Sequence, residues 1–273
     1  MKLAVMGKPI SHSKSPQIHR AAYSSLNLEW VYERIECDEA SFEETLQKFD
    51  STWRGLSLTM PLKEIAYTKA NTHDRWALAS GAVNTLLHKN NEWHGFNTDI
   101  PGLSKALTEA EMDVSHTVIL GTGATAVSAI LAAKELGAKT INLLGRRSEV
   151  AKKISEEFTT ETFTVDWGVL DGSPLLKEVS AVISTLPGPA GKIVKLSEEL
   201  FGAHLFDVAY DPWPSPLTLR WQDQHGKSSS GIGMLINQAV LQIRIFLHSD
   251  PTRELPNEES VIEAMKRASV FGP

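Results

Sequence analysis

The sequence predicts an α/β protein made of two lobes. Short apolar runs of strand length alternate with segments of helical periodicity, over residues 3–99 and again from residue 116 onward. Within the second stretch, a glycine-rich turn at residues 121–126 separates a strand-like run from a helical one. The length of 273 residues exceeds the usual size of one lobe, so two lobes are expected.

The first lobe is expected to hold a βαβαβ unit followed by a hairpin. Its strands are short apolar or alternating runs, and its helices have apolar residues at helical spacing. The predicted elements are a strand at 3–7, a helix at 17–26, a strand at 30–37, a helix at 41–49, a strand at 55–60, helices at 63–71 and 74–80, and two strands within 83–99. The hairpin turn is expected at Lys89–Asn91.

The second lobe is predicted to be a doubly wound parallel sheet covered by helices, because strand and helix signals alternate through it. The predicted elements are a helix at 102–110, a strand at 116–120, a helix at 126–137, a strand at 140–145, a helix at 150–158, and strands at 162–167, 181–187 and 203–210. Helices at 231–248 and 260–268 are expected to return to the first lobe. The lobes are therefore expected at 1–101, completed by 234–273, and at 102–233.

The composition excludes several classes of partner. A formal net charge of -6 gives no basic surface for nucleic acid or for an anionic membrane. No run approaches the ~18 apolar residues of a membrane span, and no secretory signal is recognised. Cys37 is the only cysteine, which is typical of a reducing, cytoplasmic protein. His12 and His19 have no partners at metal-ligand spacing, so no metal is expected.

The turn GTGATA has the spacing G-x-G-x-x-A of a dinucleotide-binding Rossmann lobe. Gly121 permits the tight turn, Gly123 lets the backbone approach a pyrophosphate, and Ala126 lets the helix pack against the strand. The pyrophosphate would then lie at a helix N-terminus. An accidental glycine-rich turn is the alternative. The predicted cofactor-binding residues of this loop are Gly121, Thr122, Gly123, Ala124, Thr125 and Ala126.

Two arginines indicate which nicotinamide cofactor binds. An acidic residue at the end of the second strand would bind the ribose hydroxyl of NAD, but the chain has Arg146 and Arg147 there. A guanidinium suits the 2′-phosphate of NADP, because it forms charge-assisted, bidentate hydrogen bonds. The alternative is a solvated loop, and Glu149 comes too late for the usual acid. The sequence therefore favours NADP.

The stretch SLTMPLKE places Lys63 in the first turn of a predicted helix. A helix N-terminus carries partial positive charge, so an ammonium there is unfavourable. A local rule broken without visible compensation indicates a functional site.

Six further stretches form one pattern: KPISHSKSP, LTMPLK, GAVNT, NTD, DVAYDPWPSPL and GIGMLINQA. With them the chain resembles the shikimate dehydrogenases from its first strand to its last helices. Members of that family reduce 3-dehydroshikimate to shikimate with NADPH. The resemblance implies the same reversible reaction here, with an N-terminal substrate lobe and a Rossmann lobe.

The resemblance also assigns roles to residues. Lys63 and Asp99 would form the catalytic pair, and Ser13 and Ser15 would bind the substrate carboxylate. The other substrate-binding residues would be Thr59, Asn84, Tyr210 and Gln238, and the nicotinamide would be flanked by Gly231 and Met234.

Several of these residues also have a purely structural interpretation. Ser15 precedes a proline and suits a helix N-cap, whereas Ser13 does not. Asn84 could lie in a turn or be a satisfied buried amide, Asp99 could start a loop or cap the next helix, and Tyr210 could be a core residue with its hydroxyl satisfied.

The chain departs from the family pattern at three places. Ser57 stands where the family usually has asparagine, and residues 184–186 read Ser-Thr-Leu where Asn-Ala-Thr is common. The loop GTGATA replaces GAGGAS, which adds bulk at Thr125. Contacts made at Ser57 and at the 184–189 loop are therefore open.

The implied reaction needs a proton donor where alkoxide charge develops. Lys63 is the candidate donor, and Asp99 would orient it and the substrate hydroxyl. The cofactor carries the hydride chemistry, so no metal or covalent intermediate is required. Alternatives are an NAD-dependent quinate/shikimate dehydrogenase, a methylene-tetrahydrofolate dehydrogenase and a redox-sensing module without turnover. The expected partner is a small molecule, and the sequence leaves a homodimer and quinate tolerance open.

Overall fold

The structure, a computed structural model, describes residues 1–170 and 178–270 and divides the chain into two compact units. The first unit comprises Met1–Gly102 and Leu235–Pro273, and the second comprises Leu103–Met234. Helices α5 (Asp99–Glu109) and α9 (Ile232–His248) each run from one unit into the other. The predicted boundaries fall one residue before those of the structure. Which ligand each unit binds stays a prediction.

The first unit is built on a six-stranded mixed sheet with the order β2-β1-β3-β5-β6-β4. Strands β2, β1 and β3 are parallel, and β5 is antiparallel to both β3 and β6. The elements in chain order are β1 (Lys2–Gly7), α1 (Ser15–Ser25), β2 (Val31–Glu36), α2 (Glu39–Leu46), β3 (Trp53–Leu58), α3 (Lys63–Lys69), β4 (Thr72–His73), α4 (Arg75–Ser80), β5 (Thr85–Lys89), β6 (Glu92–Phe96) and, at the far end of the chain, α10 (Glu258–Val270).

The predicted hairpin is confirmed, because β5 and β6 pair antiparallel and Lys89 lies opposite Glu92. Asn90 and Asn91 both have positive φ, 54° and 60°. This is the backbone that a two-residue turn needs to match the twist of the strands, and asparagine adopts it readily.

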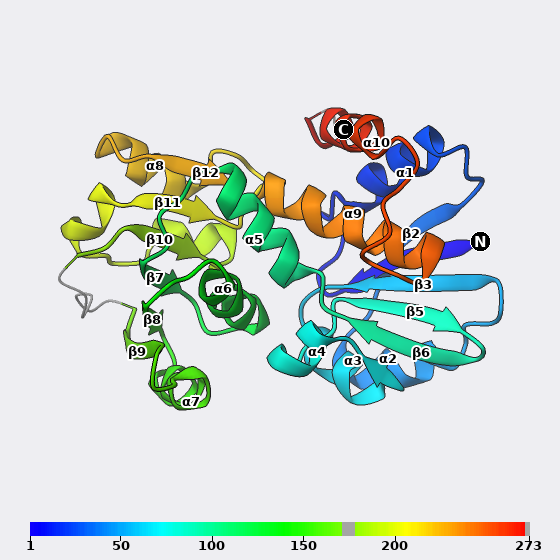
Figure 1. Ribbon diagram of the computed structural model, residues 1–273, viewed down its shortest axis with the longest axis horizontal. Coiled ribbons are helices and arrows are strands. Elements are labelled where there is room, and N and C mark those ends of the chain that lie inside the picture. Colours follow the sequence, from blue (N-terminus) through cyan, green and yellow to red (C-terminus); the bar gives the residue numbers. More distant parts are fainter. Residues whose placement is uncertain (171–177, 271–273) are drawn as a thin grey trace. The chain divides into compact units, whose positions relative to one another are not determined.

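Helices cover both faces of the first sheet (Figure 1). Helices α2, α3 and α4 lie on one face, where Phe42, Leu56 and Leu86 belong to one buried cluster. Helices α1, α9 and α10 lie on the other. There α9 approaches β3 so closely that a side-chain carbon at Gly55 would collide with the Phe246 ring. The predicted return of the C-terminal helices to the first lobe is therefore confirmed.

The second unit is built on a six-stranded parallel sheet with the order β12-β11-β10-β7-β8-β9. This is the doubly wound order of a Rossmann lobe, so the predicted fold class is confirmed. The elements are β7 (His116–Leu120), α6 (Ala124–Glu135), β8 (Thr140–Gly145), α7 (Ser148–Phe158), β9 (Thr164–Val169), β10 (Ala181–Ser184), η1 (Gly188–Lys192), η2 (Glu198–Gly202), β11 (His204–Asp207), α8 (Pro216–Asp223) and β12 (Ser228–Ser230). Helices α6 and α7 cover one face and α8 the other (Figure 1).

The structure corrects the predicted elements between residues 181 and 230. The strands predicted at 181–187 and 203–210 end earlier, at Ser184 and Asp207. Helix α8 was missed because a proline-rich segment precedes it, although Ser215 caps it by accepting the Thr218 N–H at 3.0 Å. Strands β4 and β12 are too short for a periodic signal.

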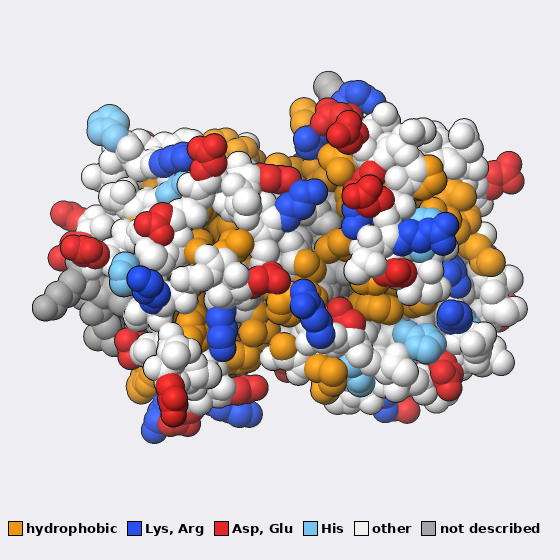
Figure 2. All heavy atoms as spheres, viewed as in Figure 1, with side chains coloured by type: hydrophobic (Ala, Val, Ile, Leu, Met, Phe, Trp, Pro, Cys, Tyr) orange, Lys and Arg blue, Asp and Glu red, His pale blue; other side chains and the backbone are white. Residues whose placement is uncertain are grey.

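Acidic and basic side chains are interspersed on the face of the described residues shown in Figure 2, which agrees with the net charge of -6. Within residues 1–170 and 178–270, none of the helices combines the length and the apolar character that crossing a membrane requires.

Candidate active site

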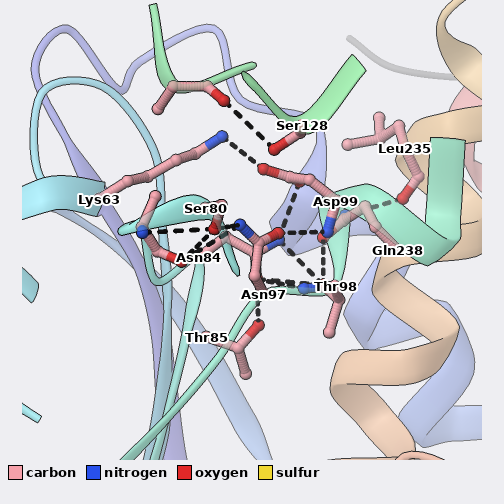
Figure 3. Close-up of polar contacts among 12 residues, drawn as sticks. Lys63, Ser80, Asn84, Thr85, Asn97, Thr98, Asp99, Ser128, Leu235 and Gln238 are labelled. Carbon is pink, nitrogen blue, oxygen red and sulfur yellow. Dashed lines mark hydrogen bonds and ion pairs between the residues drawn. The ribbon is translucent and has the colours of Figure 1, made fainter. Parts of the chain in front are cut away.

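Lys63 and Asp99 form a short, buried ion pair in the first unit (Figure 3). Their Nζ and Oδ2 atoms lie 2.6 Å apart, and the side chains are only 12% and 8% exposed. Lys63 is the first residue of α3 and Asp99 the first of α5. A carboxylate suits a helix N-terminus and an ammonium does not, so the Asp99 carboxylate offsets the unfavourable position of Lys63.

Asn84 holds the other oxygen of Asp99. Its Nδ2 donates to Asp99 Oδ1 at 2.8 Å and to Thr98 Oγ1 at 2.9 Å, while its Oδ1 accepts the Thr98 N–H at 2.8 Å. The Asn84 backbone is fixed between strands, since its carbonyl accepts from Leu58 N and its N–H donates to Phe96 O. Asn84 is therefore a satisfied buried amide that also orients the Asp99 carboxylate.

Asn97 fixes the backbone from which Asp99 projects. Its Oδ1 accepts the Asp99 N–H at 3.0 Å, and its Nδ2 donates to Ser80 Oγ at 2.9 Å and to the Ala82 carbonyl at 3.1 Å. The loop between β6 and α5 is thus tied to the end of α4. The NTD motif contained this information, but sequence reasoning assigned a role only to its aspartate.

Gln238 lies beside this cluster on α9, with its Oε1 3.5 Å from Thr98 Oγ1 and its Nε2 donating to the Leu235 carbonyl. The backbones of α5 and α9 approach closely here, because a side-chain carbon at Gly102 would lie 2.8 Å from Gln238 N. The structure therefore joins four predicted site residues, Lys63, Asp99, Asn84 and Gln238, in one group of contacts.

The two serines that were predicted to bind the substrate carboxylate lie at the start of α1. The structure does not place Ser15 at the N-cap position. The N-cap position is Lys14, and Ser15 is the first helical residue. Ser13 Oγ accepts the Ser15 N–H at 3.3 Å, so Ser13 rather than Ser15 contributes a capping-type bond. The Arg34 guanidinium donates twice to the Ser13 carbonyl, at 2.6 and 3.2 Å, and holds this loop in place.

Thr59 follows β3 and is half-buried. Its N–H donates to the Met6 carbonyl at 2.9 Å, and its methyl group packs so closely on Gly7 that a side-chain carbon there would collide with it. The Thr59 carbonyl accepts the N–H of Leu62, the residue before Lys63, at 2.9 Å, and none of the hydrogen bonds of Thr59, Ser13 and Ser15 among the described residues is to Lys63 or Asp99.

The glycine-rich loop of the second unit fits the predicted roles of its glycines. Gly121 has a φ of 116°, and a side chain there would collide with Thr185. Gly123 is the N-cap of α6 without a side-chain cap, and a side-chain carbon there would meet no atom within 4 Å among the described residues. Ala126 is fully buried. Free N–H groups and open space at this helix end suit an anion.

The remaining loop residues differ in orientation. Ala124 begins α6, and Thr125 follows it half-exposed. The Thr122 methyl group lies against Gly145 at the end of β8, where a side-chain carbon would collide with it. The methyl group of Thr122 thus faces β8 and fills the space above that glycine.

Arg146 and Arg147 directly follow β8 and are both exposed. Within the described part of the chain, neither guanidinium has a hydrogen bond or an ion pair. Unlike Arg244, which is paired with Glu258, these two side chains have all their donors available for a ligand.

The last predicted residues of the second unit follow β11 and β12 in the chain. Gly231 lies against the Val208 carbonyl, with which a side chain would collide, and its N–H donates to the Ala209 carbonyl at 3.4 Å. Met234 is buried on α9, and Tyr210 is half-buried after β11.

Ser57 has its hydrogen-bonding capacity engaged within the protein. It is 4% exposed, accepts from the Tyr32 hydroxyl at 2.6 Å and donates to Gln242 Oε1 at 2.7 Å. Sequence reasoning missed Gln242. Its position four residues after Gln238 on a helix was a usable signal, because residues at that spacing share a helix face.

Comparison with known proteins places this chain in a family. Residues 5–86 match the family described as the shikimate dehydrogenase substrate binding domain. A shikimate dehydrogenase (NADP(+)) of Syntrophobacter fumaroxidans is 33% identical over 272 residues, which is 97% of this chain and 92% of the relative. The chain belongs to the shikimate dehydrogenase family. The predicted resemblance is thereby confirmed over nearly the whole length.

Solved shikimate dehydrogenases share both units. The Mycobacterium tuberculosis enzyme is 32% identical with a TM-score of 0.83, and the match covers 98% of each chain. The Thermus thermophilus enzyme, solved in complex with NADP(H) and shikimate, is 28% identical with a TM-score of 0.83 over 98% of this chain and 99% of that one.

Proposed function

We propose that this chain is an NADP-dependent shikimate dehydrogenase that reversibly reduces 3-dehydroshikimate to shikimate. The observation that carries this function is the buried Lys63–Asp99 pair, 2.6 Å apart, in a chain that also has a dinucleotide-binding loop. Relatives that match nearly the whole chain are named shikimate dehydrogenase (NADP(+)). An NAD-dependent quinate/shikimate enzyme is not favoured by these names or by the two arginines that follow β8.

Lys63 is the proton donor of the proposed reaction. Its ammonium has three N–H donors, and Asp99 takes one of them, so the others are available for the carbonyl oxygen of the substrate. As hydride reaches the carbonyl carbon, negative charge grows on that oxygen, and a fixed ammonium stabilises it and transfers a proton. In the direction of oxidation, the neutral amine takes the hydroxyl proton back.

Asp99 orients this chemistry. One of its oxygens accepts from Lys63 and the other from Asn84, which fixes the carboxylate plane. An ionised carboxylate has about four acceptor sites, so it can also accept a substrate hydroxyl. Side chains fixed in this way lose little entropy when the substrate binds.

The remaining residues are proposed to hold the substrate. Ser13 Oγ accepts one bond and keeps its own hydrogen, and the Ser15 hydroxyl has no partner among the described residues. Two hydroxyl donors side by side suit the substrate carboxylate. The ring hydroxyls are assigned to Thr59 and Gln238, and Tyr210 is proposed to complete the pocket. Asn84 was predicted to join them, but its amide hydrogens and oxygen are engaged within the protein, so its proposed role is to hold Asp99.

NADPH supplies the hydride when it is bound, and the residues of the second unit fit it. The open N-terminus of α6 at Gly123 suits the pyrophosphate, and Arg146 and Arg147 suit the 2′-phosphate. Gly231 and Met234 are proposed to flank the nicotinamide.

A spectrophotometric assay of nicotinamide reduction tests this function with four combinations, shikimate or quinate with NADP or NAD. We expect turnover with shikimate and NADP to exceed the other three. Preference for NAD with quinate would establish the alternative enzyme, and cofactor binding without any turnover would indicate a sensing module. Light scattering of the purified protein tests separately whether it forms a homodimer.

A further inference from the structure

A continuous row of buried hydrogen bonds leads from Tyr32 to Asn84. The Tyr32 hydroxyl donates to Ser57 Oγ at 2.6 Å, and Ser57 donates to Gln242 Oε1 at 2.7 Å. Gln242 Nε2 donates to Thr85 Oγ1 at 3.0 Å and to the Asn84 carbonyl at 3.3 Å. Thr85 then donates to Asn84 Oδ1 at 2.8 Å. We call Tyr32, Ser57, Thr85 and Gln242 the Gln242 network.

Backbone groups fix the direction of every bond in this row. The Asn84 carbonyl can only accept, so Gln242 must turn its amide nitrogen toward it and its oxygen toward Ser57. The Thr98 N–H can only donate, so Asn84 must turn its oxygen toward Thr98 and its nitrogen toward Asp99. All side-chain donors of the row therefore point one way, and the row ends at the Asp99 carboxylate.

The Gln242 network is buried within the protein. Each of its four residues is at most 4% exposed. Burial raises the pKa of Tyr32, so its hydroxyl stays a donor, and the His19 ring stacks on it with centroids 4.1 Å apart. In such an environment each bond is strengthened, and a group that loses its partner is not rescued by water.

We infer that Gln242 is a positioning residue for the proposed reaction, which it serves by holding Asn84 in the one amide orientation that donates to Asp99. The inference rests on the proposed function. Gln242 binds both the backbone carbonyl of Asn84 and, through Thr85, the side-chain oxygen of the same residue. Together with the Thr98 N–H, these bonds hold the backbone and the side-chain oxygen of Asn84 in place.

The pairing of Ser57 with Gln242 also accounts for the departure from the family pattern. Ser57 is shorter than asparagine, and the long side chain of Gln242 comes from α9, 185 residues further along the chain, to meet it. Serine and glutamine together thus supply the donors and acceptors that a longer asparagine at position 57 would supply without a glutamine at position 242. An asparagine at 57 would collide with Gln242, because buried space is closely filled.

A reciprocal substitution experiment tests this inference on the full-length enzyme. The variants are Gln242→Met, Gln242→Ala, Ser57→Asn and the double variant Ser57→Asn with Gln242→Ala. Each is assayed for kcat and for KM of shikimate and NADP, and for the free energy of unfolding in urea. Ser269→Ala is the matched control, a buried serine of the same unit whose hydroxyl bonds within its own helix, to Lys266 O.

We expect each single variant to lower kcat on the order of tenfold with an unchanged KM for NADP, as coupled neighbours in one network do. The double variant regains most of the lost kcat, since one asparagine replaces the serine and glutamine. The control keeps the parental kcat. If the substitutions merely loosened the fold, the free energy of unfolding would fall in every variant, and kcat would not recover in the double variant.

Two results would overturn the inference: a Gln242→Met enzyme that is as active as the Ser269→Ala control, or a double variant no better than its worse parent. If Gln242→Met does not fold, Ser57→Ala serves in its place, and an unchanged kcat in that variant overturns the inference as well. If the parent enzyme does not oxidise shikimate, the proposed function fails instead. In that case the free energies of unfolding alone test whether positions 57 and 242 are coupled. If the losses of stability in Ser57→Asn and Gln242→Ala simply add in the double variant, the two residues do not form one network.

Discussion

The two units each bury an aspartate at the point where a strand or loop meets a helix, and the two carboxylates have different partners. Asp99 of the first unit binds the Lys63 ammonium and the Asn84 amide. Asp207 of the second unit, at the end of β11, binds the Ser215 hydroxyl at 2.5 Å and the Ala209 N–H at 3.2 Å. Burial raises the pKa of Asp207, and these neutral donors oppose that shift only in part.

The difference separates the chemical role proposed for Asp99 from the structural role of Asp207. Ser215, which donates to Asp207, is also the N-cap of α8, so this aspartate fixes the turn between β11 and the helix. Asp99 fixes a group that keeps spare hydrogens, the Lys63 ammonium. Of these two carboxylates, the one proposed to take part in the reaction is the one whose partner is a charged donor with hydrogens left for a ligand.

The largest expected effect comes from neutralising each aspartate in turn. Asp99→Asn removes the counter-charge of Lys63, and we expect kcat to fall by about 10²-fold or more, in line with general acid–base groups. Asp207→Asn keeps an acceptor for the Ala209 N–H, and we expect a far smaller change in kcat. Steady-state kinetics with shikimate and NADP compare the two. Equal losses would contradict the distinction drawn between them.

The second unit can be tested through its cofactor instead. Replacing Arg146 and Arg147 by alanine removes the charge-assisted bonds proposed for the 2′-phosphate, and we expect KM for NADP to rise about 10- to 100-fold. KM for NAD should change little. The exposed Arg253→Ala in the first unit is the control. If KM for both cofactors rises equally, the arginines do not select NADP.

A smaller effect concerns His19, which is fully buried in the first unit and stacks on Tyr32. Burial lowers its pKa to about 3 from 6.5, so the folded protein keeps it neutral while the unfolded chain takes up a proton below pH 6.5. As the pH is lowered from 6.5 to about 3, the free energy of unfolding should therefore fall by about 1.4 kcal/mol per pH unit. Urea unfolding of the parent and of His19→Gln at several pH values measures this. The same slope in both proteins would exclude His19 as its source.

The glycine-rich loop of the second unit and the Lys63–Asp99 pair could be predicted from the sequence, whereas the bonds of the Gln242 network could not. The glycines at 121 and 123 follow from local spacing, because a tight turn and an open helix end depend on neighbouring residues only. The pairing of Lys63 with Asp99 followed from motifs that the family shares. Both were available without knowledge of the topology.

The position of Gln242 on its helix could be read from the sequence, but the hydrogen bonds of the Gln242 network could not, because they join segments far apart in the chain. Ser57 and Gln242 are 185 residues apart, and only the return of α9 to the first sheet brings them together. The cap on α1 was misassigned for a different reason. Ser15 suits an N-cap by its local sequence, but Lys14 before it is already helical, with φ -84° and ψ -5°, so the helix starts one residue earlier than that sequence indicates.

We propose that the first unit carries the proton chemistry and the second unit binds the cofactor. Lys63→Ala tests this division of roles most directly, with NADPH affinity and kcat measured on the same preparation. The control is Lys69→Ala, a half-buried lysine of the same helix that pairs with Glu43. We predict that kcat falls by about 10²- to 10⁴-fold while NADPH affinity is unchanged. A parallel loss of NADPH binding, or a kcat equal to that of the control, would contradict the account.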